Sequence, residues 1–180
     1  MRAFLASRPV RIRYPQAVRP WQHVLEPLAG YLTLCQRLWK AGPAYAEAWN
    51  FGPHDQDARP VAQIVDRLSE LWGDEAVWEP NGNPQPPEAH HLRLDCSKAI
   101  ARLGWRSRWG LEKALETTVD WYRAYQEDRE MRDFTLSQIA AYERWVLPYL
   151  AYSEGGHLTS RNSTPYAVIL QVRHCGIRSQ

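Results

Sequence analysis

The longest regular pattern in this chain is a stripe of apolar residues between Gln22 and Lys40. The apolar positions recur every three or four residues: Val24, Leu25, Leu28, Tyr31, Leu32, Cys35, Leu38 and Trp39. This period predicts an amphipathic α-helix. Ala41-Gly42-Pro43 should end it, because glycine favours a helix C-terminus and proline cannot continue a helix. Just before the stripe, Arg19-Pro20-Trp21-Gln22-His23-Val24 places an arginine, an indole and an imidazole where an extended segment meets the helix, a usual place for a ligand site.

Short strands and one loop are predicted elsewhere. Residues 9–14 alternate apolar and basic side chains, which predicts a half-exposed strand. Ala46–Phe51 predicts a second strand that ends in a Gly-Pro turn. Leu92–Leu94 and Tyr166–Val172 are interpreted as two further strands. Residues 79–88 contain four prolines and are expected to form a loop without regular structure.

Further helices follow from apolar spacing and from capping residues. A helix is predicted between Pro60, which suits a helix start, and Gly73. Asp95 is expected to cap a helix over Cys96–Leu103, because its carboxylate can accept hydrogen bonds from free amides of the first turn. A longer helix is predicted over residues 111–125, and a weaker one over residues 126–142.

Length and charge narrow the classes of function. With 180 residues, 44% of them hydrophobic, the chain can form one domain with a core, or one domain with an appendage. A formal net charge of +2 argues against nucleic acid as a partner, because phosphate binding usually shows as a concentrated basic face. The nearest approach to such a face is a scatter of N-terminal arginines: Arg2, Arg8, Arg11, Arg13 and Arg19. We expect these side chains to orient one charged ligand or to lie on a solvated strand face.

Cysteine usage and hydropathy indicate a cytoplasmic protein. Cys35, Cys96 and Cys175 are widely spaced and form no Cys-x-x-Cys pair, which is typical of reduced thiols rather than of disulfides or a zinc site. No apolar run approaches the ~20 residues that a membrane helix needs. The first residues also lack the apolar segment of a secretory signal. The expectation is therefore a soluble chain with no membrane partner.

Several motifs resemble one family in order and spacing. They are Arg-Ala-Phe-Leu-Ala-Ser-Arg-Pro-Val from Arg2, Arg-Pro-Trp-Gln-His-Val-Leu-Glu-Pro-Leu from Arg19, Ala-Trp-Asn-Phe-Gly-Pro from Ala48, Glu-Ala-His-His-Leu-Arg-Leu-Asp-Cys-Ser-Lys-Ala from Glu88, Leu-Gly-Trp from Leu103 and Thr-Val-Asp-Trp-Tyr from Thr118. Together they resemble the C-terminal part of the CDP-glucose 4,6-dehydratases, which are extended short-chain dehydrogenase/reductases. The resemblance fades near Tyr142.

The resemblance implies an α/β fold that is mostly helical with a few short strands. The resemblance also implies that the chain is the C-terminal substrate-binding portion of such an enzyme, with the Rossmann domain absent. In the intact family the Rossmann domain holds NAD, and the enzyme converts CDP-glucose to CDP-4-keto-6-deoxyglucose for deoxysugar biosynthesis. The chain contains neither the glycine-rich turn for NAD nor a Tyr-x-x-x-Lys pair. We expect a truncated lyase that binds the nucleotide sugar, holds no NAD by itself and cannot catalyse alone.

The resemblance divides the chain into two parts and leaves alternatives for its function. Residues 1–142 are the expected nucleotide-sugar-binding portion, and residues 143–180 are an unmatched tail that we expect to be poorly ordered. The chain is alternatively a non-catalytic module that docks on a separate Rossmann-bearing subunit, or the remnant of a gene without function. Assembly of several copies of the chain also stays open.

The candidate substrate-binding residues begin at Arg19, Trp21 and His23. In related enzymes the arginine matched by Arg19 approaches the nucleotide diphosphate, which suits a guanidinium because its planar fork meets two phosphate oxygens. The alternative for Arg19 is a surface ion pair with a carboxylate such as Glu26. Trp21 could stack on the cytosine or anchor packing. His23 belongs to the same motif, although a hydrogen-bonded structural role is the commoner one for such a histidine.

The second group of candidates lies at the end of the proline-rich loop and comprises His90, His91 and Arg93. Many relatives place an arginine on the diphosphate in this region, and no arginine occurs between residues 79 and 90, so Arg93 would have to take that role. Adjacent histidines also suggest zinc, but no third ligand stands at a usable spacing, so we assign neither a metal nor a catalytic residue.

Overall fold

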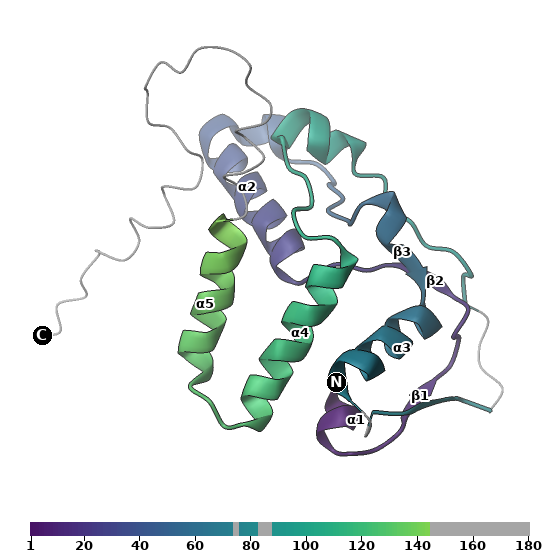
Figure 1. The fold of residues 1–180 in the computed structure, drawn as a ribbon. Coiled ribbons are helices and arrows are strands. Elements are labelled where there is room, and N and C mark those ends of the chain that lie inside the picture. The colour runs from purple at the N-terminus through teal and green to yellow at the C-terminus, as the bar shows by residue number, and fades with distance from the viewer. Residues whose placement is uncertain (74–75, 83–87, 145–180) are drawn as a thin grey trace, which may run out of the picture. The chain divides into compact units, whose positions relative to one another are not determined.

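The apolar stripe of the sequence forms a long helix, α2, which spans Leu25–Ala41 (Figure 1). It ends at Gly42, whose φ of +51° lies in the left-handed region that favours glycine. This computed structural model describes residues 1–73, 76–82 and 88–144, which lie within one compact unit, Met1–Val146. The predicted tail, residues 143–180, lies outside the described residues from position 145, and so does the strand expected over Tyr166–Val172.

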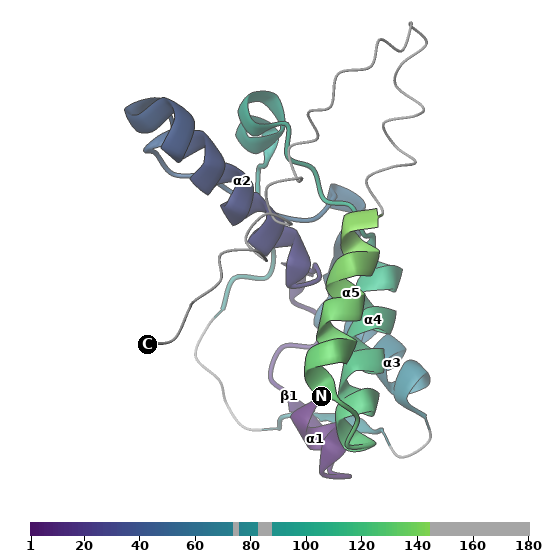
Figure 2. The same cartoon turned by 90° about the vertical axis from the view of Figure 1, so that its left-hand side faces the viewer.

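Besides α2, the helical elements are α1 (Arg2–Leu5), the 3-10 turns η1 (Gly42–Tyr45) and η2 (Asp55–Asp57), α3 (Val61–Trp72), the π-helical turn η3 (Ala99–Leu103), α4 (Leu111–Gln126) and α5 (Met131–Arg144). Helices α3 and α4 lie close to their predicted positions, whereas η3 and α5 begin three and five residues later than expected, and α1, η1 and η2 were not predicted. Figures 1 and 2 both show α4 and α5 side by side, with α3 next to α4. No helix in the described part of the chain is long and apolar enough to cross a membrane.

Four three-residue strands form two small sheets. They are β1 (Val10–Ile12), β2 (Val18–Pro20), β3 (Ala58–Pro60) and β4 (Trp78–Pro80). β1 pairs with β4 in parallel, and β2 pairs with β3 in antiparallel register, with Arg19 opposite Arg59. The strand expected over residues 9–14 is therefore confirmed as β1, and the fold is mostly helical with a few short strands, as predicted.

Two strand predictions and one loop prediction are wrong. Ala46–Phe51 forms no strand, because no neighbouring backbone pairs with it in the described residues. Leu92–Leu94 forms none either: only a single bridge joins Val18 to His91. That ladder stops because the next residue of β2 that would donate is Pro20, which has no N–H. The proline-rich stretch from residue 79 was expected to be irregular, yet its first two residues belong to β4; Pro80 ends the strand, where a missing N–H is tolerated.

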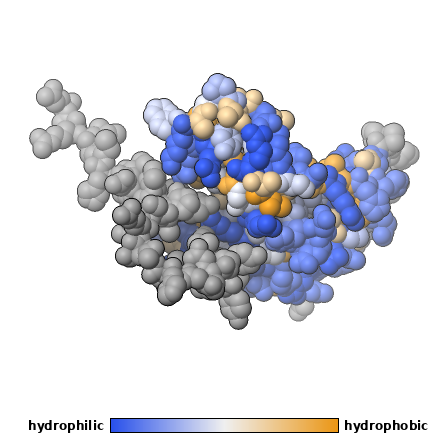
Figure 3. All heavy atoms as spheres, turned by 90° about the horizontal axis from the view of Figure 1, so that it is seen from above, coloured by the Kyte–Doolittle hydropathy of each residue, from blue (hydrophilic) through white to orange (hydrophobic). Residues whose placement is uncertain are grey.

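Three groups of buried side chains form the core. The first comprises Phe51, Ala99, Leu103 and Trp105. The second comprises Phe4, Val65 and Ala76, beneath the β1–β4 sheet residues Val10, Ile12 and Trp78. The third comprises Ala29, Trp109 and Tyr142. Helix α2 contributes to the first group through Leu34 and to the third through Ala29, so it joins the two. Seen from above in Figure 3, hydrophobic residues occur in small areas among hydrophilic ones.

A buried carboxylate lies beside the third group. Glu26, in the first turn of α2, is fully buried. Its oxygens accept hydrogen bonds from the backbone N–H of Arg108 at 3.0 Å, from that of Trp109 at 2.7 Å and from the Tyr142 hydroxyl at 2.8 Å. Glu26 is therefore not the partner of Arg19 that the sequence suggested, because it joins α2 to α5 and to the loop before α4.

Replacing Gly30 with alanine is expected to destabilise the protein. A Cβ atom at Gly30 would lie 2.4 Å from Cδ1 of the buried Phe51 ring. Alanine forms helix better than glycine by about 1 kcal/mol, but displacing a packed ring costs about 1–3 kcal/mol, so we expect a net loss. Urea unfolding should show a lower midpoint with an unchanged slope. Arg37→Ala, on an exposed position of the same helix, is the matched control; a Gly30→Ala midpoint at or above the wild-type value would contradict this packing.

Candidate functional site

The candidate site forms where residues 88–92 run along the edge of β2. The Val18 N–H donates to the His90 carbonyl at 2.8 Å, and the Leu92 N–H donates to the Val18 carbonyl at 3.1 Å. The opposite edge of β2 pairs with β3. Three segments that are far apart in the sequence therefore meet at β2, and they bring together most of the candidate residues.

Arg19 is held by a carboxylate from the second segment. Its Nη2 forms an ion pair with Glu88 Oε1, and its Nη1 donates to the Val18 carbonyl at 2.8 Å. The Arg19 side chain is only 18% exposed, so it is oriented by these contacts rather than free in solvent. A guanidinium has five N–H donors. These two contacts leave donors for a further anionic group.

Arg59 is a site residue that the sequence analysis missed. It lies directly opposite Arg19 in the antiparallel β2–β3 pair, so the two side chains leave the same face of the sheet. The Arg59 side chain is exposed and has no hydrogen-bond or ion-pair partner among the described residues. Two guanidinium groups thus share this face with the carboxylate of Glu88. An anionic ligand would relieve the repulsion of like charges placed opposite each other.

Trp21 contacts the same strands through its indole. Its Nε1–H donates to the Arg59 carbonyl at 3.0 Å, and the side chain is half-buried. This bond ties the residue after β2 to the middle of β3. The structure therefore places Trp21 beside the two arginines and gives its polar atom a structural partner.

His23 lies apart from this surface and is buried, with only 7% of its surface exposed. Its Nδ1 accepts a hydrogen bond from the Leu25 N–H at 3.3 Å, and its ring lies 5.1 Å from that of Trp109. Burial lowers the pKa of His23 to about 4, so the imidazole is neutral near pH 7. These contacts are those of a structural residue at the start of α2.

His90, His91 and Arg93 are all exposed. His90 contacts β2 through its backbone, and His91 forms the bridge to Val18. Arg93 instead lines an open pocket of about 400 Å³, together with Arg106 and the buried Trp105. In the described residues, no three His, Cys, Asp or Glu side chains are grouped as a metal ion would require.

The second half of the Glu88 motif has a structural role, as expected. Asp95 Oδ1 accepts from the Ser97 N–H at 2.9 Å, and hydrogen bonds from Ser97 lower the pKa of this carboxyl. Asn50 Nδ2 donates to the Asp95 carbonyl at 3.1 Å, which ties the Asn-Phe-Gly motif to the start of η3. The helical turn η3 ends at Gly104 of the Leu-Gly-Trp motif, which has a φ of +67°. The expected hydrogen bond between the Asp95 carboxylate and a backbone amide is therefore present, although η3 itself begins at Ala99, with Lys98 at its N-cap.

No family model matches the chain, but known proteins do. It is 47% identical to the CDP-glucose 4,6-dehydratase of Salmonella typhimurium over 142 residues, which are 79% of this chain and 40% of that protein. This identity and the fold described above point to one family. The chain is similar to the C-terminal portion of the CDP-glucose 4,6-dehydratases, which are extended short-chain dehydrogenase/reductases.

Solved structures of extended short-chain dehydrogenase/reductases share the fold. A UDP-glucose 4-epimerase of Thermotoga maritima, crystallised with UDP-glucose, is 24% identical with a TM-score of 0.51 and covers 68% of this chain and 37% of its own. The dTDP-glucose 4,6-dehydratase of Bacillus anthracis, in complex with NAD, is 16% identical with a TM-score of 0.52 and covers 72% and 39%. The chain therefore spans about two fifths of the length of its relatives.

The buried imidazole predicts a specific dependence of stability on pH. The unfolded chain protonates His23 near its ordinary pKa of 6.5, whereas the folded protein does so only near pH 4. Between these values the unfolded state binds more protons, so stability contributed by neutral His23 is lost as the pH falls. In His23→Asn the new amide oxygen can still accept a hydrogen bond from the Leu25 N–H. This variant should therefore lose less folding stability than the wild type between about pH 7 and about pH 5.

Urea midpoints at both pH values measure this difference for the wild type and the variant. His91→Asn, at an exposed histidine, is the control and should retain the wild-type dependence. Equal losses in His23→Asn and the wild type would show that His23 is not the titrating group.

Proposed function

We propose that this chain is the nucleotide-sugar-binding portion of a CDP-glucose 4,6-dehydratase-like protein and binds CDP-glucose. The single observation that carries the proposal is the Arg19–Arg59 pair, of which Arg19 is fixed by Glu88. Two guanidinium groups on one strand face suit a diphosphate, because each planar fork can meet two phosphate oxygens. The 47% identity to a CDP-glucose 4,6-dehydratase supports cytidine as the base.

The remaining candidates would surround the diphosphate. Trp21 lies beside Arg59. His90 and His91 follow Glu88 in the segment that pairs with the edge of β2 opposite to β3. We place Arg93 outside the immediate diphosphate contacts, because it lines the separate pocket. His23 would act indirectly, by fixing the start of α2 behind the strand pair.

The chain's own residues do not fit NAD, the cofactor of the intact family. The phosphates of a dinucleotide require a glycine-rich turn between a strand and a helix. In the described residues, the short strands lead into no such turn, and the full sequence has no Gly-x-Gly-x-x-Gly. We therefore propose no hydride step for this chain, and we infer that it works in the cytoplasm, in deoxysugar synthesis, with a catalytic part supplied elsewhere.

Calorimetric titration of the purified 180-residue protein with CDP-glucose tests the ligand. We expect saturable binding that Arg19→Ala weakens ~10-fold or more, because a hydrogen bond to a charged group contributes about 1.5–3 kcal/mol. Arg19→Lys keeps the charge but loses the fork and should be intermediate. Arg59→Ala should weaken binding less, because its side chain is not fixed in advance.

Arg37→Ala is the control for a general loss of positive charge and should bind like the wild type. Binding that is absent in the wild type, or unchanged in Arg19→Ala, would overturn the proposed site. A dehydratase assay with NAD and CDP-glucose should show no turnover by the chain alone, and turnover would overturn the assignment of a non-catalytic portion.

A further inference from the structure

The pocket that contains Arg93 lies outside the proposed diphosphate site. Its volume is about 400 Å³, which is within the range of small-molecule sites. Its walls come from three segments: residues 52–55, residues 93–97 together with Ile100, and residues 105–107. Arg19, Arg59 and Glu88 are not among the described residues that line it. The pocket is therefore distinct from the strand face that carries the two opposed arginines.

Close packing fixes the walls of this pocket. A Cβ atom at Gly52 would lie 2.9 Å from the Leu94 Cβ, so only glycine allows these two segments to approach so closely. The Gly52 N–H donates to Cys96 Sγ at 3.0 Å. The buried Trp105 ring meets Phe51 edge-on, with ring centroids 5.0 Å apart, and so joins the third wall to the core. The pocket is preformed, as small-molecule sites usually are.

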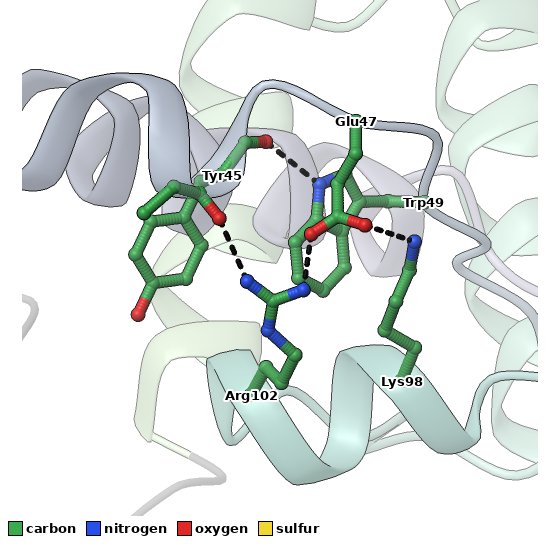
Figure 4. A network of polar contacts seen from close by, with 6 residues as sticks. Tyr45, Glu47, Trp49, Lys98 and Arg102 are labelled. Carbon is green, nitrogen blue, oxygen red and sulfur yellow. Dashed lines mark hydrogen bonds and ion pairs between the residues drawn. The ribbon is translucent and has the colours of Figure 1, made fainter.

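An ion-pair network anchors the helical turn η3, which contributes Ile100 to the pocket. Figure 4 shows Glu47 between Lys98 and Arg102. Glu47 Oε2 accepts from Lys98 Nζ at 3.0 Å, and Glu47 Oε1 pairs with Arg102. The hydrogen bonds from Lys98 and Arg102 lower the pKa of Glu47, so the network persists over the neutral range. These two cations therefore already have a protein carboxylate as their partner.

Two other cations, both at the pocket, have no such partner. The side chains of Arg93 and Arg106 line it and are exposed, and neither forms a hydrogen bond or ion pair within the ranges that the structure describes. Of the two carboxylates in the lining, Asp95 already accepts hydrogen bonds from Ser97. The Asp55 side chain has no partner among the described residues. The pocket thus presents two guanidinium groups and one carboxylate to a ligand.

The remaining lining adds no further negative charge. Burial raises the pKa of the Cys96 thiol, and the carboxylates of Asp95 and Asp55 raise it as well, so this thiol is neutral near pH 7. Pro53 and Ile100 contribute apolar surface. The lining therefore suits a ligand that combines an anionic group with a body carrying both C–H surface and hydrogen-bond donors.

We propose that this pocket is a second ligand site, which binds a phosphate monoester with a hydroxylated body through Arg93, Arg106 and Asp55. A phosphate monoester carries a charge of about −1.5 to −2 at pH 7 and three acceptor oxygens, which suits two guanidinium forks. An ionised carboxylate only accepts hydrogen bonds, so Asp55 requires a donor such as a hydroxyl. The proposal does not depend on the binding of CDP-glucose at the Arg19–Arg59 face.

Calorimetric titration of the full 180-residue protein with glucose 6-phosphate tests this site. We expect saturable binding that Arg93→Ala and Arg106→Ala each weaken ~10-fold or more, because each removes charge-assisted hydrogen bonds. Asp55→Ala should weaken the binding of glucose 6-phosphate but not that of inorganic phosphate, because it removes an acceptor for hydroxyls. Arg37→Ala and Arg19→Ala are the controls and should bind glucose 6-phosphate like the wild type.

The thiol of Cys96 locates the ligand without a substitution. With glucose 6-phosphate at about ten times its Kd, alkylation of Cys96 by iodoacetamide should slow ~10-fold, because only about a tenth of the pockets stay free. Alkylation of Cys35, which is exposed on α2, should keep its rate. Saturable binding with unchanged alkylation of Cys96 would overturn the pocket as the site.

The other outcomes are distinct. The absence of saturable binding of glucose 6-phosphate and of cytidine monophosphate would overturn the proposal. If either ester binds through the two arginines, the site is supported, and the tighter ester identifies the body as a sugar or a nucleoside. Glucuronate that binds as tightly as glucose 6-phosphate would overturn the phosphate.

CDP-glucose titration of Arg93→Ala is read separately. It should match the wild type, because Arg93 lies outside the diphosphate contacts. If the chain fails to bind CDP-glucose but still binds a phosphate monoester through Arg93 and Arg106, the proposed function is lost and the second site remains.

Discussion

The buried carboxylate of Glu26 is the interaction on which the arrangement of helices depends. A charge taken out of water costs several kcal/mol unless donors surround it. Glu26 meets donors from the loop before α4 and from α5, so α2 can occupy its observed place only when both are present. Its position in the first turn of α2 adds the favourable field at a helix N-terminus. The packing of Trp109 against Tyr142, with ring centroids 5.0 Å apart, follows from this requirement.

Helices were predictable from the sequence because their signals are local. Apolar spacing identified α2, α3 and α4, and glycine, proline and Asp95 gave their ends to within a few residues. Strands depend on a partner that the local sequence does not reveal. Ala46–Phe51 has strand character and no neighbour in the described residues, whereas Trp78–Pro80 pairs with β1 despite its proline. The wrong predictions therefore concern strands, whose formation depends on pairing with a neighbouring strand rather than on local propensity.

The candidate site could be predicted only in part, for the same reason. Arg19 and the segment from Glu88 were found through motifs, and the structure brings them into contact across 69 positions of sequence. Arg59 was missed because its role comes from the antiparallel register that sets it opposite Arg19. Glu26 was considered only as a partner for Arg19, since nothing in its neighbours along the chain reveals the donors more than 80 positions away.

The hydroxyl of Tyr142 has a consequence for where this unit can be divided. The resemblance to the dehydratases fades at about this residue, which would make it a natural place to cut the chain in protein engineering. The phenol, however, supplies one of the donors around Glu26, and its ring packs against Trp109. A shorter version lacking Tyr142 would leave a buried anion with fewer donors and an exposed indole. The smallest portion that retains this packing therefore includes α5 through Tyr142.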